Sequence, residues 1–168
     1  MSLTKSALLP ALMLCLLAAA LGFACSWREP APDLALARLG GARFTLAALR
    51  GKVVFVSFWA SSCPSCVREM PRLAALDARY AGRGYRSLAI AVRDEDPEGV
   101  RAFARRHALP FAVAHDASGA AASAFGGVVL TPTGFLIDKR GRIALELVGE
   151  PDWAVFEERL KALLAEAD

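Results

Sequence analysis

The sequence predicts an α/β domain in which helices flank a central mixed sheet. Two continuous β-branched and aromatic runs, "KVVFVSFWA" at 52–60 and "YRSLAIAV" at 85–92, have the length of strands covered on both faces. Between them, apolar residues recur every three or four positions from 65 to 80, which predicts a helix with one buried stripe. Further on, "GFLID" and "RIALELV" flank the turn residues "KRG", a pattern typical of a β-hairpin.

Local patterns predict the remaining elements. The segment "LARLGGARFTLAAL" predicts an additional β-hairpin on the N-terminal side of the sheet, turning at its two glycines. Pro71 is expected to kink the helix that it interrupts, and Asp96 is expected to cap a second helix with Pro97 in its first turn. The rest of the chain predicts, in order, a short strand at 110–115, a weak helix at 118–127 and, after the second hairpin, a final helix at 151–167.

Composition indicates one globular domain. Of the 168 residues, 55% are apolar and 22% are charged, which suits a well-buried core. The formal net charge of +3 comes from arginines spread over the chain, and no basic run is interleaved with aromatic residues. This distribution argues against nucleic-acid binding.

Residues 1–25 are expected to be a signal peptide or a membrane anchor. The run from Ala7 to Ala24 carries no charge, and its length lies between that of a signal-peptide core and that of a spanning helix. Both interpretations export the rest of the chain, and Lys5 favours a cytoplasmic N-terminus. Cys25 comes directly after small residues and is either a lipid-acceptor cysteine or an unmodified thiol. The protein is therefore expected outside the cytoplasm, tethered to the inner membrane or secreted after cleavage.

Residues 26–32 are expected to form a linker, because prolines at 30 and 32 hold the chain extended. The folded domain is then expected to span 33–168.

Two cysteines three residues apart stand where the first strand passes into a helix. Cys63 is expected in the first turn of this helix, where a thiolate is favoured because backbone amides and the helix dipole favour negative charge. Cys66 lies close enough along the helix to attack a mixed disulfide formed at Cys63. The pair can therefore cycle between dithiol and disulfide.

Two other roles are open to this pair. A structural zinc site needs four ligands, but only His107 and His115 could add to the two thiols, and the chain has no second CxxC. A purely structural disulfide would stabilise little, because it closes a very short loop. No metal and no cofactor is expected.

The segments "FWASSCPSCVREMPRL" and "TPTGFLIDKRGRI" resemble the exported TlpA/ResA-like branch of the thioredoxin-fold thiol–disulfide oxidoreductases, from about Asp33 to the C-terminus. The resemblance implies a thioredoxin fold with an N-terminal hairpin extension. It also implies that Cys63 attacks and Cys66 resolves. Pro132 would be a cis-proline, with Thr131 offering its backbone to the substrate.

Three more residues are candidates for the site. By resemblance, Glu69 would transfer a proton at the active site; its alternative is a first-turn glutamate that complements the helix dipole. Trp59 and Pro64 are candidates for substrate contact, with core packing as the alternative for Trp59. Ser57 stands where thioredoxin has a buried aspartate, which leaves Glu69 as the only nearby carboxylate expected to serve as base.

The expected function is exchange of electrons with disulfide- or dithiol-bearing proteins of the cell envelope. The reductive direction is favoured, for example in cytochrome c or envelope protein maturation, and the oxidative direction stays open. A membrane electron donor would recharge the pair. Thr133 stands where cytochrome c maturation members often carry a glutamate, which weakens that assignment. The alternative is a peroxiredoxin-like thiol peroxidase, but Ala60 replaces its usual threonine or serine, and the chain contains no asparagine or glutamine.

Overall fold

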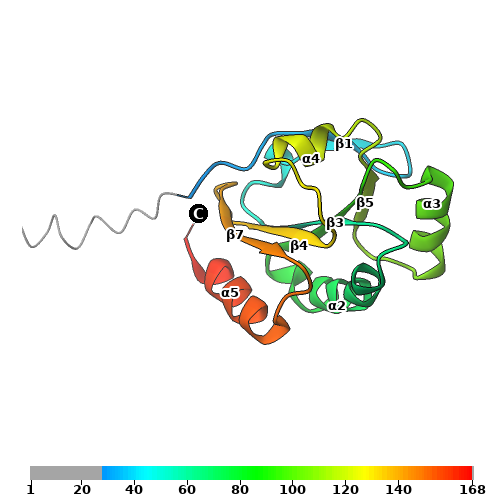
Figure 1. Ribbon diagram of the computed structural model, residues 1–168. Helices are drawn as coiled ribbons and strands as arrows, with labels where there is room; N and C mark the ends of the chain where they lie inside the picture. The colour runs from blue at the N-terminus through cyan, green and yellow to red at the C-terminus, as the bar shows by residue number, and fades with distance from the viewer. Residues whose placement is uncertain (1–27, 168) are drawn as a thin grey trace, which may run out of the picture.

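A computed structural model describes residues 28–167, which form a five-stranded sheet in the order β5-β4-β3-β6-β7 (Figure 1). The strands are β3 (Val53–Trp59), β4 (Tyr85–Ala91), β5 (Ala112–His115), β6 (Thr133–Ile137) and β7 (Ile143–Val148). Strand β3 pairs parallel with β4 and antiparallel with β6. The expected mixed sheet is confirmed, and the two apolar runs form two of its three inner strands.

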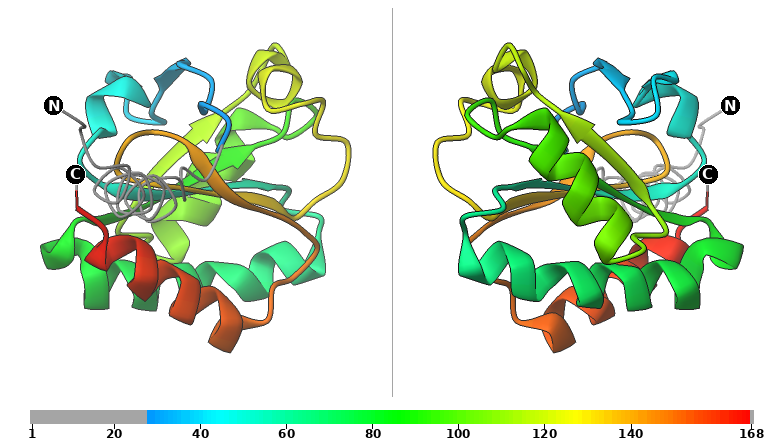
Figure 2. Two further views of the ribbon diagram at one scale, coloured as in Figure 1. Left: turned by 90° about the vertical axis from the view of Figure 1, so that its left-hand side faces the viewer. Right: turned by 90° about the vertical axis from the view of Figure 1, so that its right-hand side faces the viewer.

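Both faces of the sheet are covered. Helices α2 (Pro64–Tyr80), α3 (Pro97–Arg106) and α5 (Trp153–Ala165) share one apolar core with β3 and β4. The other face packs against the hairpin of β1 (Ala35–Ala37) and β2 (Arg43–Thr45), a short helix η1 (Ala47–Leu49), and α4 (Ala120–Ala124). Figure 2 shows α2 and α5 side by side on one side of the sheet, with the hairpin and α4 on the opposite side.

The N-terminal hairpin is confirmed and is also joined to the main sheet. Strands β1 and β2 pair antiparallel, and the chain after β1 reaches the free edge of β5, where Leu39 N donates to Val113 O at 3.0 Å. The hairpin therefore covers the outer edge of the sheet, which an unpaired strand would otherwise expose.

The expected helices are present, but the last two are shorter than expected, and α5 begins at Trp153 and ends at Ala165. Asp96 caps α3 by accepting from the amides of Glu98 and Gly99, and Pro71 lies inside α2, which continues to Tyr80. The weak helix expected at 118–127 shortens to α4, because Gly119 and the glycines at 126 and 127 adopt positive φ, which a right-handed helix cannot contain.

The described part of the expected linker is bound to the domain. Arg28 pairs with Asp138 at 3.0 Å and with Glu166 at 2.9 Å, and Ile143 N donates to Glu29 O at 2.7 Å. Residues 29–31 lie beside the turn between β6 and β7, where Ala31 N donates to Gly141 O at 2.9 Å. The leader expected at 1–25 lies outside the described residues, and no helix within 28–167 is long and apolar enough to cross a membrane.

Candidate active site

The site begins at the turn that joins β3 to α2. Strand β3 is buried along its whole length, and Cys63 is the N-cap of α2, one position before the first turn where it was expected. Its Sγ accepts a hydrogen bond from Cys66 N at 3.2 Å. Pro64 occupies the first turn, where its missing amide proton costs nothing. The sulfur thus takes the place of a capping oxygen, at a helix end that favours negative charge.

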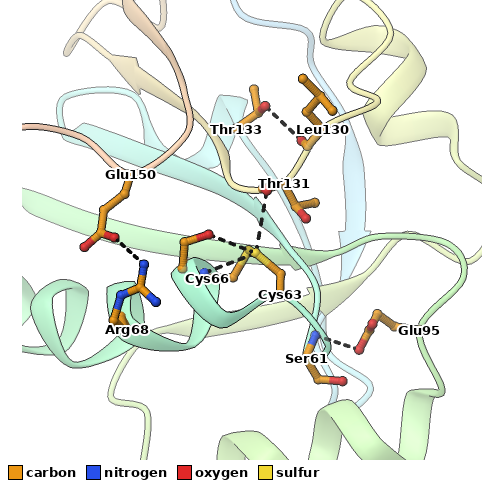
Figure 3. The surroundings of a disulfide bond; sticks show 10 residues. Ser61, Cys63, Cys66, Arg68, Glu95, Leu130, Thr131, Thr133 and Glu150 are labelled. Carbon is orange, nitrogen blue, oxygen red and sulfur yellow. Dashed lines mark hydrogen bonds and ion pairs between the residues drawn. A yellow bond between two sulfur atoms is a disulfide. The ribbon is translucent and has the colours of Figure 1, made fainter.

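The two sulfurs differ in access. Cys63 and Cys66 form a disulfide with their Cα atoms 5.2 Å apart (Figure 3). Cys66 is fully buried in the core, whereas Cys63 is partly exposed, and Ser65 Oγ lies 3.3 Å from Cys63 Sγ. A sulfur atom of another protein can therefore reach Cys63 but not Cys66.

The loop before β6 lies directly over this disulfide. The Thr131–Pro132 peptide bond is cis, and the carbonyl oxygen of Thr131 is 3.6 Å from Cys63 Sγ. Thr133 is buried, and its hydroxyl donates to Leu130 O at 2.9 Å, which ties the two ends of the loop together. Two segments almost seventy residues apart in the sequence thus meet at one sulfur.

Glu69 lies beneath this surface in the interior. Glu69 is only 1% exposed. It follows Cys66 by one helical turn, so the Cβ atoms of the two residues are roughly 5–6 Å apart. No acidic residue occupies the first turn of α2. The alternative role expected for Glu69, a first-turn partner of the helix dipole, is therefore wrong.

Burial raises the pKa of Glu69 to about 7. The hydroxyl of Ser57 partly offsets this rise, and the negative charge of Glu150 adds to it. Ser57 Oγ is itself buried without a hydrogen-bond partner of ordinary geometry among the described residues. A carboxyl with this pKa can both accept and release a proton near neutral pH.

Two further carboxylates lie near the site, each held by a partner of its own, and the role of Glu69 as the base stays a prediction. Glu95 Oε2 accepts from Ser61 N at 2.9 Å (Figure 3). Glu150, in the loop after β7, pairs with Arg68 on α2 at 3.0 Å. The position of Glu95 had a sequence signal, because it comes soon after β4 and the carboxyl ends of neighbouring parallel strands meet at one edge of a sheet.

The two remaining candidates lie in different environments. Trp59 is fully buried, and its ring packs against Phe103 with the centroids 4.9 Å apart. This contact supports the core-packing role left open by the sequence. Pro64 is exposed beside Cys63, where a bound partner could contact it.

Exposed apolar side chains lie on one side of the site. Among the described residues, Val129 and Leu130, in the loop before Thr131, are 90% and 60% exposed, and Val148, at the end of β7, is 64% exposed. All three line one shallow groove of about 190 Å³. Exposed apolar side chains gathered in this way are typical of a protein-binding surface. Within 28–167, no group of three or more His, Cys, Asp or Glu side chains is placed to hold a metal ion.

These features together define a class: a thiol–disulfide oxidoreductase with a thioredoxin fold. The chain belongs to the Redoxin family, whose family model matches residues 28–164.

Relatives agree with this class. The chain is 35% identical over 135 residues to the thiol-disulfide oxidoreductase ResA of Bacillus thuringiensis subsp. konkukian, covering 80% of this chain and 77% of that protein. It is 39% identical over 119 residues to the ResA of Geobacillus thermodenitrificans, covering 71% and 67%.

Solved structures with the same fold include a putative thioredoxin from Neisseria meningitidis, at a TM-score of 0.78 and 35% identity, covering 83% of this chain and 93% of that one. A putative thiol:disulfide interchange protein DsbE from Chlorobium tepidum has a TM-score of 0.76 and 31% identity, covering 82% and 97%. The fold and the enzyme class expected from the sequence are confirmed.

Proposed function

We propose that this oxidoreductase reduces disulfides of partner proteins on the outer side of the cytoplasmic membrane. The observation that carries the proposal is the difference in access between a partly exposed Cys63 at a helix N-terminus and a fully buried Cys66. An attacking sulfur must be reachable and stabilised as a thiolate, whereas a resolving sulfur must be near the first and shielded from other partners.

The first step is attack by the Cys63 thiolate on one sulfur of a partner disulfide. A bond forms between Cys63 Sγ and that sulfur, and the partner's second sulfur leaves as a thiolate. The partner's backbone would lie against Thr131, whose carbonyl is already beside Cys63 Sγ. The apolar side chains of Val129, Leu130 and Val148 would contact the residues flanking the partner's cysteine.

The second step is attack by Cys66 on Cys63 Sγ. The Cys66 thiol first gives its proton to the Glu69 carboxylate, and the bond to the partner then breaks, so that the partner's remaining sulfur leaves with both electrons. The products are a reduced partner and the Cys63–Cys66 disulfide. A dithiol donor must then reduce this pair by the reverse sequence, and a membrane electron donor would suit a protein exported by its leader.

The substrates are proposed to be envelope proteins with disulfides, including apocytochromes c. Support comes from the apolar leader in the sequence and from the resemblance to the relatives that are named thiol-disulfide oxidoreductases.

Trapping tests the scheme. Cys66→Ser should hold partners as stable mixed disulfides on Cys63, because the second step is blocked. Cys63→Ser, the matched control, should trap none, since Cys66 is buried. Recovery of no adduct with Cys66→Ser, or equal recovery with both variants, would count against it.

Two measurements separate direction and class. The equilibrium of the Cys63–Cys66 pair with glutathione gives its potential, and a value below that of glutathione supports the reductive direction. The peroxidase alternative would be excluded if the rate of insulin reduction exceeds the rate of hydrogen peroxide consumption and both rates are lost in Cys63→Ser.

A further inference from the structure

A notch occupies the corner of the sheet where β4 begins. Strand β5 pairs with β4 only from Leu88 onward, opposite Ala112, so the first three residues of β4 have no neighbouring strand on that side. Asp77 of α2 fills part of the gap, and its Oδ2 accepts from Ser87 N at 3.0 Å. Because β5 begins late, a space stays open beside the start of β4. It lies between the hairpin and the end of α2.

This space is a cleft of about 580 Å³, within the size range of small-molecule sites. Its walls come from four separate parts of the chain. Phe44 and Leu49 line it from the hairpin side, Ala81 from the end of α2, Leu88 from β4, and Phe111 from the segment before β5. Apolar and aromatic walls of this kind are usual for a ligand-binding site.

Three cationic residues line the cleft. They are Arg38, Lys52 and Arg86. Within 28–167, none of the three forms an ion pair with a carboxylate. Two are held in place by other contacts: the Arg38 guanidinium lies 5.2 Å from the Phe44 ring centroid, and Arg86 Nη1 donates to the carbonyl of Ala81 at 2.8 Å.

The lining carries more positive than negative charge. Among residues 28–167, Asp77 is the one acidic residue that lines the cleft, against three cations. Burial raises the pKa of Asp77, although hydrogen bonds from Ser87 and the charge of Arg86 oppose the rise. A ligand with about two negative charges would balance these groups.

We infer that this cleft binds a ligand carrying a phosphate monoester, with the phosphate on Arg38, Lys52 and Arg86 and an apolar part against Phe44 and Phe111. A phosphate monoester carries about −1.5 to −2 charges at neutral pH. Guanidinium groups bind its oxygens in a planar fork, and lysine adds a point charge. The phosphate comes either from a soluble phosphate ester or from a phospholipid headgroup.

The cleft is separate from the disulfide. Lys52 directly precedes β3 and Cys63 lies beyond its other end, so the two sites lie at opposite ends of that strand. Thiol–disulfide exchange and ligand binding can therefore be measured independently.

The soluble source is tested by titrating the purified full chain, in a non-ionic detergent, with glycerol 3-phosphate and recording the heat of binding. The double variant Arg38→Ala/Lys52→Ala should weaken binding at least about tenfold, since it removes two of the three phosphate contacts. Arg105→Ala/Arg106→Ala removes the same charge from the exposed end of α3 and should leave binding unchanged. Both double variants should reduce insulin at the rate of the unaltered chain.

The lipid source is tested in nanodiscs of phosphatidylcholine with or without phosphatidic acid. Slower amide hydrogen exchange at 85–88 with phosphatidic acid, lost in Arg38→Ala/Lys52→Ala, would assign the headgroup; heat of binding with glycerol 3-phosphate alone would assign a soluble ester. Either result supports the site. Absence of both effects, or equal losses in the two double variants, would overturn it.

Discussion

Replacing Glu69 with glutamine tests whether a buried carboxyl at the site stores a proton near neutral pH. Burial raises its pKa from 4.5 to about 7, whereas in the unfolded chain the carboxyl is solvated. Between these two values the folded protein keeps a proton that the unfolded chain has lost. The free energy of unfolding therefore falls as the pH rises from about 4.5 to about 7, and the full loss persists above that range.

The two pKa values set the size of this loss. At ~1.4 kcal/mol for each pH unit, a rise from 4.5 to about 7 corresponds to about 3–4 kcal/mol. Glutamine has a similar shape and no charge, so Glu69→Gln should gain stability relative to the unaltered chain by about this amount between pH 4 and pH 8. The same substitution should slow the attack of Cys66 on a mixed disulfide, because the proton acceptor is gone.

Urea unfolding of the oxidised protein at several pH values measures the free energy of unfolding. Release of a chromogenic thiol from a mixed disulfide at Cys63 measures the rate of attack by Cys66. Glu158→Gln, at an exposed position of α5, controls for the loss of one carboxylate. If the stability difference between Glu69→Gln and the unaltered chain does not change with pH, the buried-proton argument fails. Unchanged resolution kinetics would leave Glu69 a structural residue.

Three further predictions concern the support of the site. Gly134→Ala should lower the free energy of unfolding by about 1–3 kcal/mol in urea titrations, because a methyl group there would overlap the buried Phe55 ring; an unchanged midpoint would contradict this. Burial favours a raised pKa for Asp138, but hydrogen bonds from two arginines hold the pKa below its usual value. The stability lost in Asp138→Asn at pH 7 should therefore disappear as the pH falls below about 4, which urea unfolding at acid pH measures. A stability difference that persists at pH 2 would refute the lowered pKa. Glu95→Ala should destabilise the oxidised protein by about 1–2 kcal/mol and slow insulin reduction, because Ser61 N loses a charged acceptor, whereas Glu95→Gln, which keeps an acceptor oxygen, should lose less; equal effects would contradict the hydrogen-bond argument.

The sequence predicted the strands and the position of the cysteines well because both depend on local features. The apolar composition of β3 indicates that the strand is buried. The spacing of Cys63 and Cys66 indicates that both lie at the N-terminal end of one helix. Of the two roles left open for Glu69, the first-turn role fails because α2 begins at Pro64, within one residue of the predicted start, and places the carboxyl beyond the first turn and in the interior.

Features that depend on strand register could not be predicted. The late start of β5 relative to β4 creates the notch, and neither strand alone signals how far they overlap. For Glu95 the sequence indicates the edge of the sheet but not the contact with Ser61, which requires that β3 and β4 end at the same level. The attachment of residues 28–31 beside the turn between β6 and β7 depends in part on the ion pairs of Arg28 with residues more than a hundred positions away.

The ion pairs of Arg28 also fix which end of the sheet lies next to the N-terminal segment of the chain. Asp138 comes directly after β6, at the level where β3 begins, whereas Cys63 lies beyond the end of β3, roughly 20 Å away at ~3.3 Å per residue. A chain anchored through its leader would thus hold its reactive sulfur on the side facing away from the lipid. Client proteins diffusing in the surrounding compartment would meet that sulfur directly, and a donor embedded in the bilayer would have to extend a domain of its own to regenerate it.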